Sequence, residues 1–204
     1  MSGKIFKKGK KYTFSDYFEM GYPTEEIAAE LGYSYSVQKL TLPISNETDK
    51  ESVEYLRSSY YAVIPKVSVN SEAAKRELMI APILQSVLKT TDSRLKIEYP
   101  VDVDERLSGS IDYFFRSKYK LIVIEAKKGD LEKGFNQLAA EMIAVDKSEE
   151  NDSLNILYGA ISIGEVWRFA ILERENKHLV KDINTFRFPE DLEDIFSILK
   201  GILS

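Results

Sequence analysis

The chain has 204 residues, of which 44% are hydrophobic and 30% charged, and its formal net charge is −5. This length and apolar content predict one globular domain with an extension. The lack of cysteine excludes disulfides and thiolate zinc sites, and a single histidine, His178, excludes multi-histidine metal sites and disfavours a serine–histidine triad. No apolar run approaches the ~18 residues of a membrane helix, so we expect a cytoplasmic protein without a membrane partner.

The net charge argues against a nucleic-acid partner, because a basic face is the usual footprint of such binding. The lysines are segregated, however. One cluster lies near the start of the chain (Lys4, Lys7, Lys8, Lys10 and Lys11). It is either a solvated tail or an arm that lies on phosphates. A second group surrounds the central motif described below (Lys118, Lys120, Lys127, Lys128 and Lys133).

Residues 1–48 are interpreted as a basic tail and N-terminal extension, and residues 49–204 as the main domain. Two short helices are predicted at 14–20 and 24–31. They suggest the beginning of a helix-turn-helix, but the following residues 35–42 predict a strand instead of a recognition helix. We therefore expect this extension to pack on the domain.

The first half of the main domain predicts helices at 51–63 and 71–89 and a strand at 95–103. Glu77 interrupts the apolar stripe of the second helix, where an unpaired charge is costly. It is either held by a metal or a basic residue, or the helix is rotated so that Glu77 reaches water. Pro82 is expected to kink this helix.

The central stretch predicts two strands, at 111–115 and 121–124, and the second runs into Glu125-Ala126-Lys127. Side chains alternate along a strand, so Glu125 and Lys127 share a face. A short polar turn at 116–119 predicts a hairpin in which Asp112 lies opposite Val123 and diagonal to Glu125. Two carboxylates so placed suit a hard cation such as Mg²⁺, with Mn²⁺ as an alternative ion.

The second half predicts an amphipathic helix from about residue 131 to 145, capped by Asp130. Gln137 and Glu141 share one flank of it. Strands follow at 154–162 and 166–172, and an edge strand at 179–183. A helix at 191–203 ends the chain. Trp167 is expected in the core and His178 at the surface.

Asp112, the Glu125-x-Lys127 motif at the end of an apolar strand, and the following helix with Gln137 resemble the PD-(D/E)XK nuclease superfamily. The likeness spans residues 71–172 and is nearest to the restriction-endonuclease-like domain of type I restriction motor subunits. It implies an α/β fold with an αβββαβ core, in which a central mixed sheet is flanked by helices, here with a helical N-terminal extension.

The resemblance also implies a Mg²⁺-dependent endonuclease acting on DNA. Asp112, Glu125 and the backbone carbonyl of Ala126 would be metal ligands, with Glu77 as a further acid. Lys127 and Gln137 would be catalytic. Lys118 and Lys128 would contact the nucleic acid, and a homodimer is left open.

The sequence leaves three alternatives to a DNA-cutting enzyme. The charged residues can form a structural cluster, with Glu125 and Lys127 paired to each other and to Asp112. The domain can bind nucleic acid or a protein without cutting. It can also hydrolyse nucleotides or another small phosphate ester.

Overall fold

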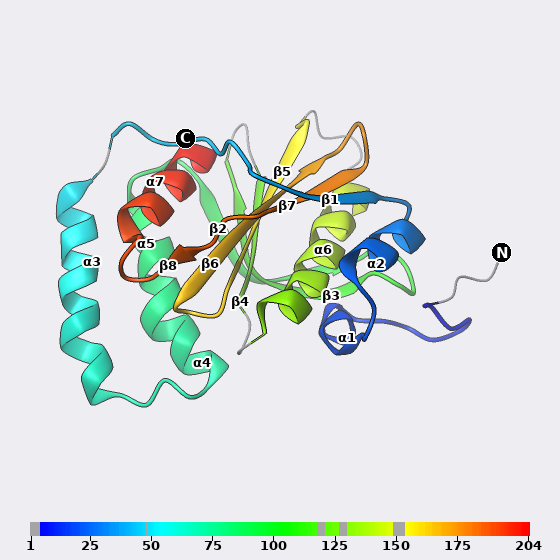
Figure 1. Cartoon of the computed structure of the whole chain (residues 1–204), viewed down its shortest axis with the longest axis horizontal. Helices are drawn as coiled ribbons and strands as arrows, with labels where there is room; N and C mark the ends of the chain where they lie inside the picture. The colour runs from blue at the N-terminus through cyan, green and yellow to red at the C-terminus, as the bar shows by residue number, and fades with distance from the viewer. Residues whose placement is uncertain (1–4, 48, 118–120, 127–129, 149–153) are drawn as a thin grey trace.

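The structure is a computed structural model that describes residues 5–47, 49–117, 121–126, 130–148 and 154–204, with the backbone alone for 121–126. One mixed sheet with helices on both faces forms the fold, as expected (Figure 1). The helix–strand–strand–strand–helix–strand order of the centre also agrees with the sequence prediction. Within the described residues, no helix combines the length and apolar character needed to cross a bilayer.

The strands are β1 (Ser34–Gln38), β2 (Arg94–Asp102), β3 (Ser108–Arg116), β4 (Leu121–Ala126), β5 (Ile156–Ser162), β6 (Val166–Glu173), β7 (His178–Asp182) and β8 (Phe186–Arg187). Their order is β1-β7-β6-β5-β4-β3-β2, with β8 beside β6. The β4–β5 and β1–β7 pairs are parallel and the others antiparallel. The expectation that β7 is an edge strand is wrong, because β1 from the N-terminal extension pairs outside it.

The helices are α1 (Phe14–Glu19), α2 (Thr24–Leu31), α3 (Lys50–Val63), α4 (Glu72–Lys75), α5 (Ala81–Lys89), α6 (Leu131–Ser148) and α7 (Leu192–Leu203). A 3₁₀ turn, η1 (Ile64–Lys66), follows α3, and a π-helical turn, η2 (Arg76–Ile80), joins α4 to α5. Figure 1 shows α4, α5 and α7 on one side of the sheet and α1, α2 and α6 on the other.

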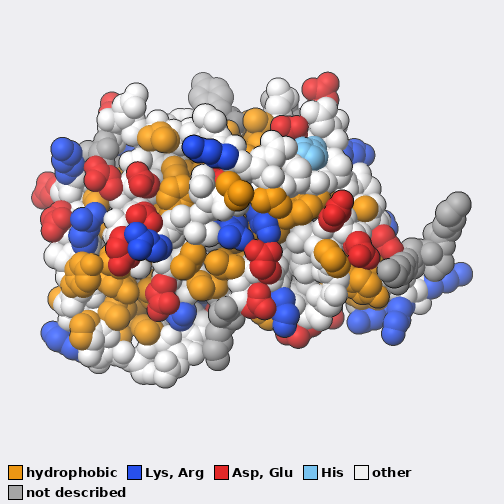
Figure 2. Space-filling view, in the orientation of Figure 1, with side chains coloured by type: hydrophobic (Ala, Val, Ile, Leu, Met, Phe, Trp, Pro, Cys, Tyr) orange, Lys and Arg blue, Asp and Glu red, His pale blue; other side chains and the backbone are white. Residues whose placement is uncertain are grey.

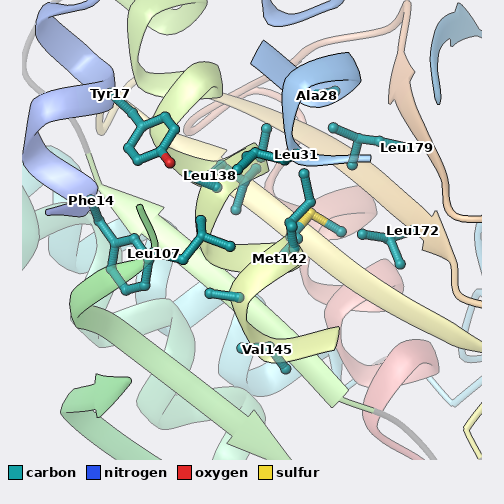
Figure 3. Packing of buried hydrophobic residues seen from close by; sticks show 14 of the residues in the cluster. Phe14, Tyr17, Ala28, Leu31, Leu107, Leu138, Met142, Val145, Leu172 and Leu179 are labelled. Atoms are coloured by element: carbon teal, nitrogen blue, oxygen red, sulfur yellow. The ribbon is translucent and has the colours of Figure 1, made fainter. Parts of the chain in front are cut away.

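Helix α6 is buried on all sides from Gly134 to Asp146. Its Leu138 and Met142 pack against Gly159 of β5, where any side chain would collide with them. Its outer side is covered by the N-terminal extension: Asn136 accepts a hydrogen bond from Thr24 (2.6 Å) and donates one to the Tyr22 carbonyl (3.1 Å). Figure 3 shows Tyr17, Ala28 and Leu31 closing this core from outside. The extension therefore completes the core that holds α6.

The basic segment at the start of the chain also lies on the core. Ile5 and Tyr12 are buried, and the Ile5 amide donates to Glu30 (3.0 Å). The lysines of this segment that the structure describes are exposed (Lys7, Lys8, Lys10 and Lys11). Apolar anchors at both ends thus hold a short basic loop against the protein, so that residues 5–12 are not a free tail.

The opposite face of the sheet carries a second core. It contains Trp167, fully buried as expected, together with Met79, Ile83 and Phe196. His178 is partly buried at the start of β7, where Ser34 and Ser36 bond its two ring nitrogens. It is far along the sheet from β3 and β4, which carry the predicted metal ligands.

Candidate functional site

The register of β3 and β4 differs from the predicted one. Phe114 lies opposite Val123 and Tyr113 opposite Ile124, whereas Asp112 was expected opposite Val123. The shift arises because β3 continues to Arg116, which pairs with Leu121, so the connecting loop begins only at Ser117. Continued by one position past Tyr113 and Ile124, this register brings Asp112 directly opposite Glu125. A slip of two residues would preserve the alternation between faces in a regular ladder, but the β2–β3 pairing skips Asp112, and its carboxylate lies on the side opposite α6.

The alternation of side chains along β3 is interrupted at Asp112. Ile111 belongs to the core around α6, whereas Tyr113 and Phe115 belong to the core under α5 and α7. The residue of β2 facing Asp112, Glu98, has a left-handed backbone with φ of 52°. The β2–β3 hairpin thus bends here, and Asp112 stands at the bend between the two helical layers.

The Asp112 carboxylate contacts the helical layer opposite α6. Arg76 Nη1 lies 3.3 Å from Asp112 Oδ1, and the two side chains are only 27% and 17% exposed. Tyr113 lies beside them. Burial raises the pKa of its hydroxyl, Glu77 and Asp112 raise it further, and Arg76 opposes them. Two acids, an arginine and a phenol therefore share this corner of the sheet.

Glu77 reaches water instead of interrupting a buried stripe. The i→i−4 pattern of a regular helix put it in line with Ile80 and Leu84, but residues 76–80 form a π-helical turn. The wider turn rotates the preceding residues, so that Met79 and Ile80 are buried and Glu77 is exposed. Pro82 follows in the first turn of α5, where its missing N–H is tolerated.

Gln137 and Glu141 share a flank of α6, as predicted, and both are buried, at 3% and 0% exposure. Gln137 is therefore not an exposed polar residue of the helix. Gln137 Nε2 donates to Glu141 Oε1 over 2.9 Å. Gln137 Oε1 is also buried and has no hydrogen-bond partner among the described residues. A buried amide oxygen of this kind needs a partner, so its position suits a water or a ligand.

The neighbours of α6 show which strand this flank faces. Phe135 packs on Tyr35 of β1 and lies under Lys181 of β7. Leu138 and Met142 lie over β5. Each residue of an α-helix is rotated by 100° about the helix axis from the one before it. Around the axis, the side chains therefore come in the order Phe135 by β7, Met142 and Leu138 over β5, and then Glu141 and Gln137 on the side of β4. Position 125 pairs with Ile161, whose side chain belongs to the same α6 core.

A charged cluster beside the start of α6 was not predicted. Arg168 Nη1 donates a hydrogen bond to one carboxylate oxygen of Glu132, and Lys181 Nζ donates one to the other oxygen, both over 2.7 Å. Burial would raise the pKa of Glu132, but the bonds from Lys181 and Arg168 outweigh it and lower that pKa. The one sequence signal was a single cation, Arg168, within the otherwise apolar run from Val166 to Leu172 in β6.

Several predicted site residues lie outside the described part of the chain. These are Lys118, Lys127 and Lys128, and the side chains of Glu125 and Ala126. Among the side chains that are described, no group of three His, Cys, Asp or Glu residues gathers to hold a metal. Of the four predicted acidic and amide residues, Asp112, Glu77 and Gln137 thus have described side chains, and Glu125 has only its place in the register.

No family model matches the chain, and a search of curated proteins also gives no match.

Proposed function

We propose that the chain is a divalent-metal-dependent nuclease that hydrolyses phosphodiester bonds of DNA. The observation that supports this proposal is the register of β3 and β4, together with a buried amide oxygen on α6 that has no hydrogen-bond partner among the described residues. Continued one position past Tyr113 and Ile124, the register would bring the backbone of Asp112 opposite that of Glu125. Gln137, on a buried flank of α6, has an oxygen with no partner in the described residues.

The donor set fits Mg²⁺ or Mn²⁺, which prefer carboxylate and carbonyl oxygens. Asp112, Glu125 and the Ala126 carbonyl would hold the ion, and Glu77, exposed on the π-helical turn that also carries Arg76, would join from that side. When bound, the ion would neutralise charge on the attacked phosphate and lower the pKa of a bound water. The partnerless oxygen of Gln137 supports a polar occupant on the α6 side of the sheet, the side on which position 125 lies beside Ile161.

The remaining tasks fall to side chains of this chain. Lys127 would orient the attacking water, take its proton, or stabilise the charged transition state, because a lysine near positive charge has a lowered pKa. Gln137 would fix the orientation of that water through its free oxygen, since its amide nitrogen is already engaged by Glu141. Lys118 and Lys128, which flank β4 in sequence, would contact backbone phosphates.

A plasmid-cleavage assay tests the proposal with Mg²⁺, Mn²⁺ or EDTA. We expect metal-dependent cutting by the wild type and a loss of at least about 100-fold in both variants, because Asp112→Asn removes a metal ligand and Lys127→Ala removes the general base. Lys89→Ala, an exposed lysine at the end of α5, is the control and should cut normally. Equal cutting by all four proteins would identify a contaminating nuclease and refute the assignment.

One observation favours a second candidate, a nuclease-like domain that binds nucleic acid or a protein without cutting. Arg76 already neutralises Asp112, and this pair would compete with a metal for the carboxylate. DNA binding without cleavage, unchanged by EDTA and by Asp112→Asn, would support this candidate over the enzyme.

A further inference from the structure

The cluster of Glu132, Arg168 and Lys181 has an unusual distribution of exposure. The two cationic side chains are 17% and 10% exposed, whereas the Glu132 side chain is 65% exposed. The cations are thus fixed in the protein, and the anion that joins them is at the surface. The point on which both cations converge is therefore accessible from solvent. In the middle of Figure 2, blue and red side chains lie side by side near β6, β7 and the start of α6.

Both cations are largely buried, and the Nε of Arg168 has no hydrogen-bond partner among the described residues. The Lys181 ammonium lies near the Tyr35 hydroxyl, where it opposes the rise that burial causes in the pKa of Tyr35, and 5.2 Å from the centre of the Phe135 ring. Arg168 extends from β6 between the buried residues Trp167 and Phe169. Because two positive charges meet one negative charge, the cluster keeps an excess of one positive charge. A preorganised pair of cations of this kind suits a doubly coordinated anion such as a phosphate.

The cluster lies along the sheet from the candidate metal site. Glu125 pairs with Ile161 of β5, and Ile161 pairs with Arg168 of β6, so positions 125 and 168 lie in one row across three strands. Two strand spacings separate them, about 10 Å. A single phosphate group cannot occupy both places, but neighbouring phosphates of a polynucleotide can. This separation therefore favours a polymer over a free nucleotide.

We propose that Arg168 and Lys181 form a phosphate-binding subsite for the polynucleotide backbone, and that the Glu132 carboxylate occupies it in the free protein. The subsite rests on the proposed nuclease function and gives it a substrate-binding flank. On binding, a backbone phosphate takes the place of the carboxylate between the two cations. Glu132, which belongs to the first turn of α6 and is mostly exposed, then turns to solvent.

The test is equilibrium binding of a fluorescent 20-base-pair DNA in EDTA at several salt concentrations, so that cutting does not interfere. Arg168→Gln and Lys181→Gln should each weaken binding several-fold and lower the slope of log K against log salt by about 0.9. Arg94→Gln is the matched control, because Arg94 is an exposed arginine at the start of β2, where it pairs with Arg116 and not with β6 or β7. It should leave the slope unchanged.

Glu132→Gln is the decisive variant, because it keeps both cations and remains informative if the other two variants fail to fold. Removing the competing anion should tighten binding by about three- to tenfold. Glu54→Gln, which changes an exposed acid on α3, controls for the general gain of charge and should have a smaller effect.

The outcomes separate the subsite from the nuclease function. Binding by the wild type, with Arg168→Gln matching Arg94→Gln and Glu132→Gln matching Glu54→Gln, overturns the subsite and leaves the nuclease proposal intact. Absence of any binding by the wild type overturns both.

Discussion

The Arg76 guanidinium lies 3.3 Å from Asp112, the acid predicted to begin the metal site, and it reaches this place from a π-helical turn. The turn matters because a regular helix from Glu72 to Lys89 would carry residue 76 in a different direction. Single π-helical turns are frequent at functional sites. Here the turn brings a cation and an acid, Arg76 and Glu77, to the corner of the sheet that Asp112 and Tyr113 occupy.

Arg76→Gln should strengthen the binding of a divalent cation if Asp112 is a metal ligand. The substitution removes a positive charge that competes for the carboxylate in a partly buried place. We expect the dissociation constant for Mn²⁺ to fall roughly three- to tenfold, about 0.7–1.4 kcal/mol. Isothermal titration calorimetry of the wild type and the variant measures this change.

Arg94→Gln controls for the change in net charge, and Asp112→Asn in the Arg76→Gln background should abolish the gain. If Arg76→Gln instead unfolds the protein or leaves Mn²⁺ affinity unchanged, the pair is a structural ion pair and Asp112 does not hold a metal.

Gln137 and Glu141 offer a test of stability inside the core. Gln137→Met keeps most of the side-chain volume but removes the donor to Glu141 Oε1. Removing a donor from a buried acceptor costs about 1–3 kcal/mol, so we expect the free energy of unfolding to fall by about 2 kcal/mol. Urea denaturation followed by the fluorescence of Trp167, the single tryptophan and fully buried, measures it.

The double variant Gln137→Met/Glu141→Met should be more stable than the sum of the two single variants, because replacing both polar partners removes the unmet hydrogen bond. Strict additivity of the two losses would show that the bond between these side chains contributes nothing.

The strands were predictable from sequence because their residues alternate or are continuously apolar, as in β3 and β4. The i, i+4 spacing of Gln137 and Glu141 also predicted that they share one flank of α6. The register of β3 and β4 was wrong because the end of β3 depends on how the hairpin closes at Arg116 and Leu121, not on the polarity of the turn. Polar turn residues specify a hairpin without specifying its length.

Other features depend on contacts between distant residues. The π-helical turn at Arg76–Ile80 changes the phase of the helix, and no residue type marks it in the sequence. The pairing of β1 beside β7 joins residues about 140 positions apart, as does the bond from Ser36 to His178. The Glu132 cluster likewise draws its members from α6, β6 and β7. A search along the chain cannot find such groups.

Gly159 of β5 is expected to tolerate no side chain. A β-carbon added there would overlap with Met142 Sδ and would lie 3.3 Å from Leu138 Cδ1. Overpacking of this kind costs about 1–3 kcal/mol, so Gly159→Ala should lower the free energy of unfolding by that amount. Gly21→Ala is the control, because nothing lies within 4 Å of the added carbon.

Met142→Val should relieve part of the loss, since valine lacks the atom that collides. We expect Gly159→Ala/Met142→Val to be more stable than the sum of the single variants, by urea denaturation. A loss of less than 0.5 kcal/mol in Gly159→Ala alone would mean that α6 can move away from the sheet.

Tyr158 gives a prediction for alkaline pH. Burial raises the pKa of its hydroxyl above the ordinary value near 10. In the unfolded chain this group loses its proton first, so the folded state binds more protons above pH 10. The stability that the neutral phenol contributes is therefore full below about pH 10 and is lost as the pH rises through the folded pKa. Tyr158→Phe should resemble the wild type at pH 8 and lose less stability between pH 10 and 11.

Urea denaturation at pH 8, 10 and 11 measures the difference, with Tyr55→Phe as the control. Tyr55 is 70% exposed, so its replacement should leave the alkaline loss of the wild type in place. The two variants keep their rings and differ only in how far the lost hydroxyl was buried. If Tyr158→Phe falls in stability as steeply as Tyr55→Phe, burial of the Tyr158 hydroxyl makes no measurable contribution to the alkaline limit. The other tyrosines whose pKa burial raises, Tyr17, Tyr35, Tyr60 and Tyr113, would then account for it.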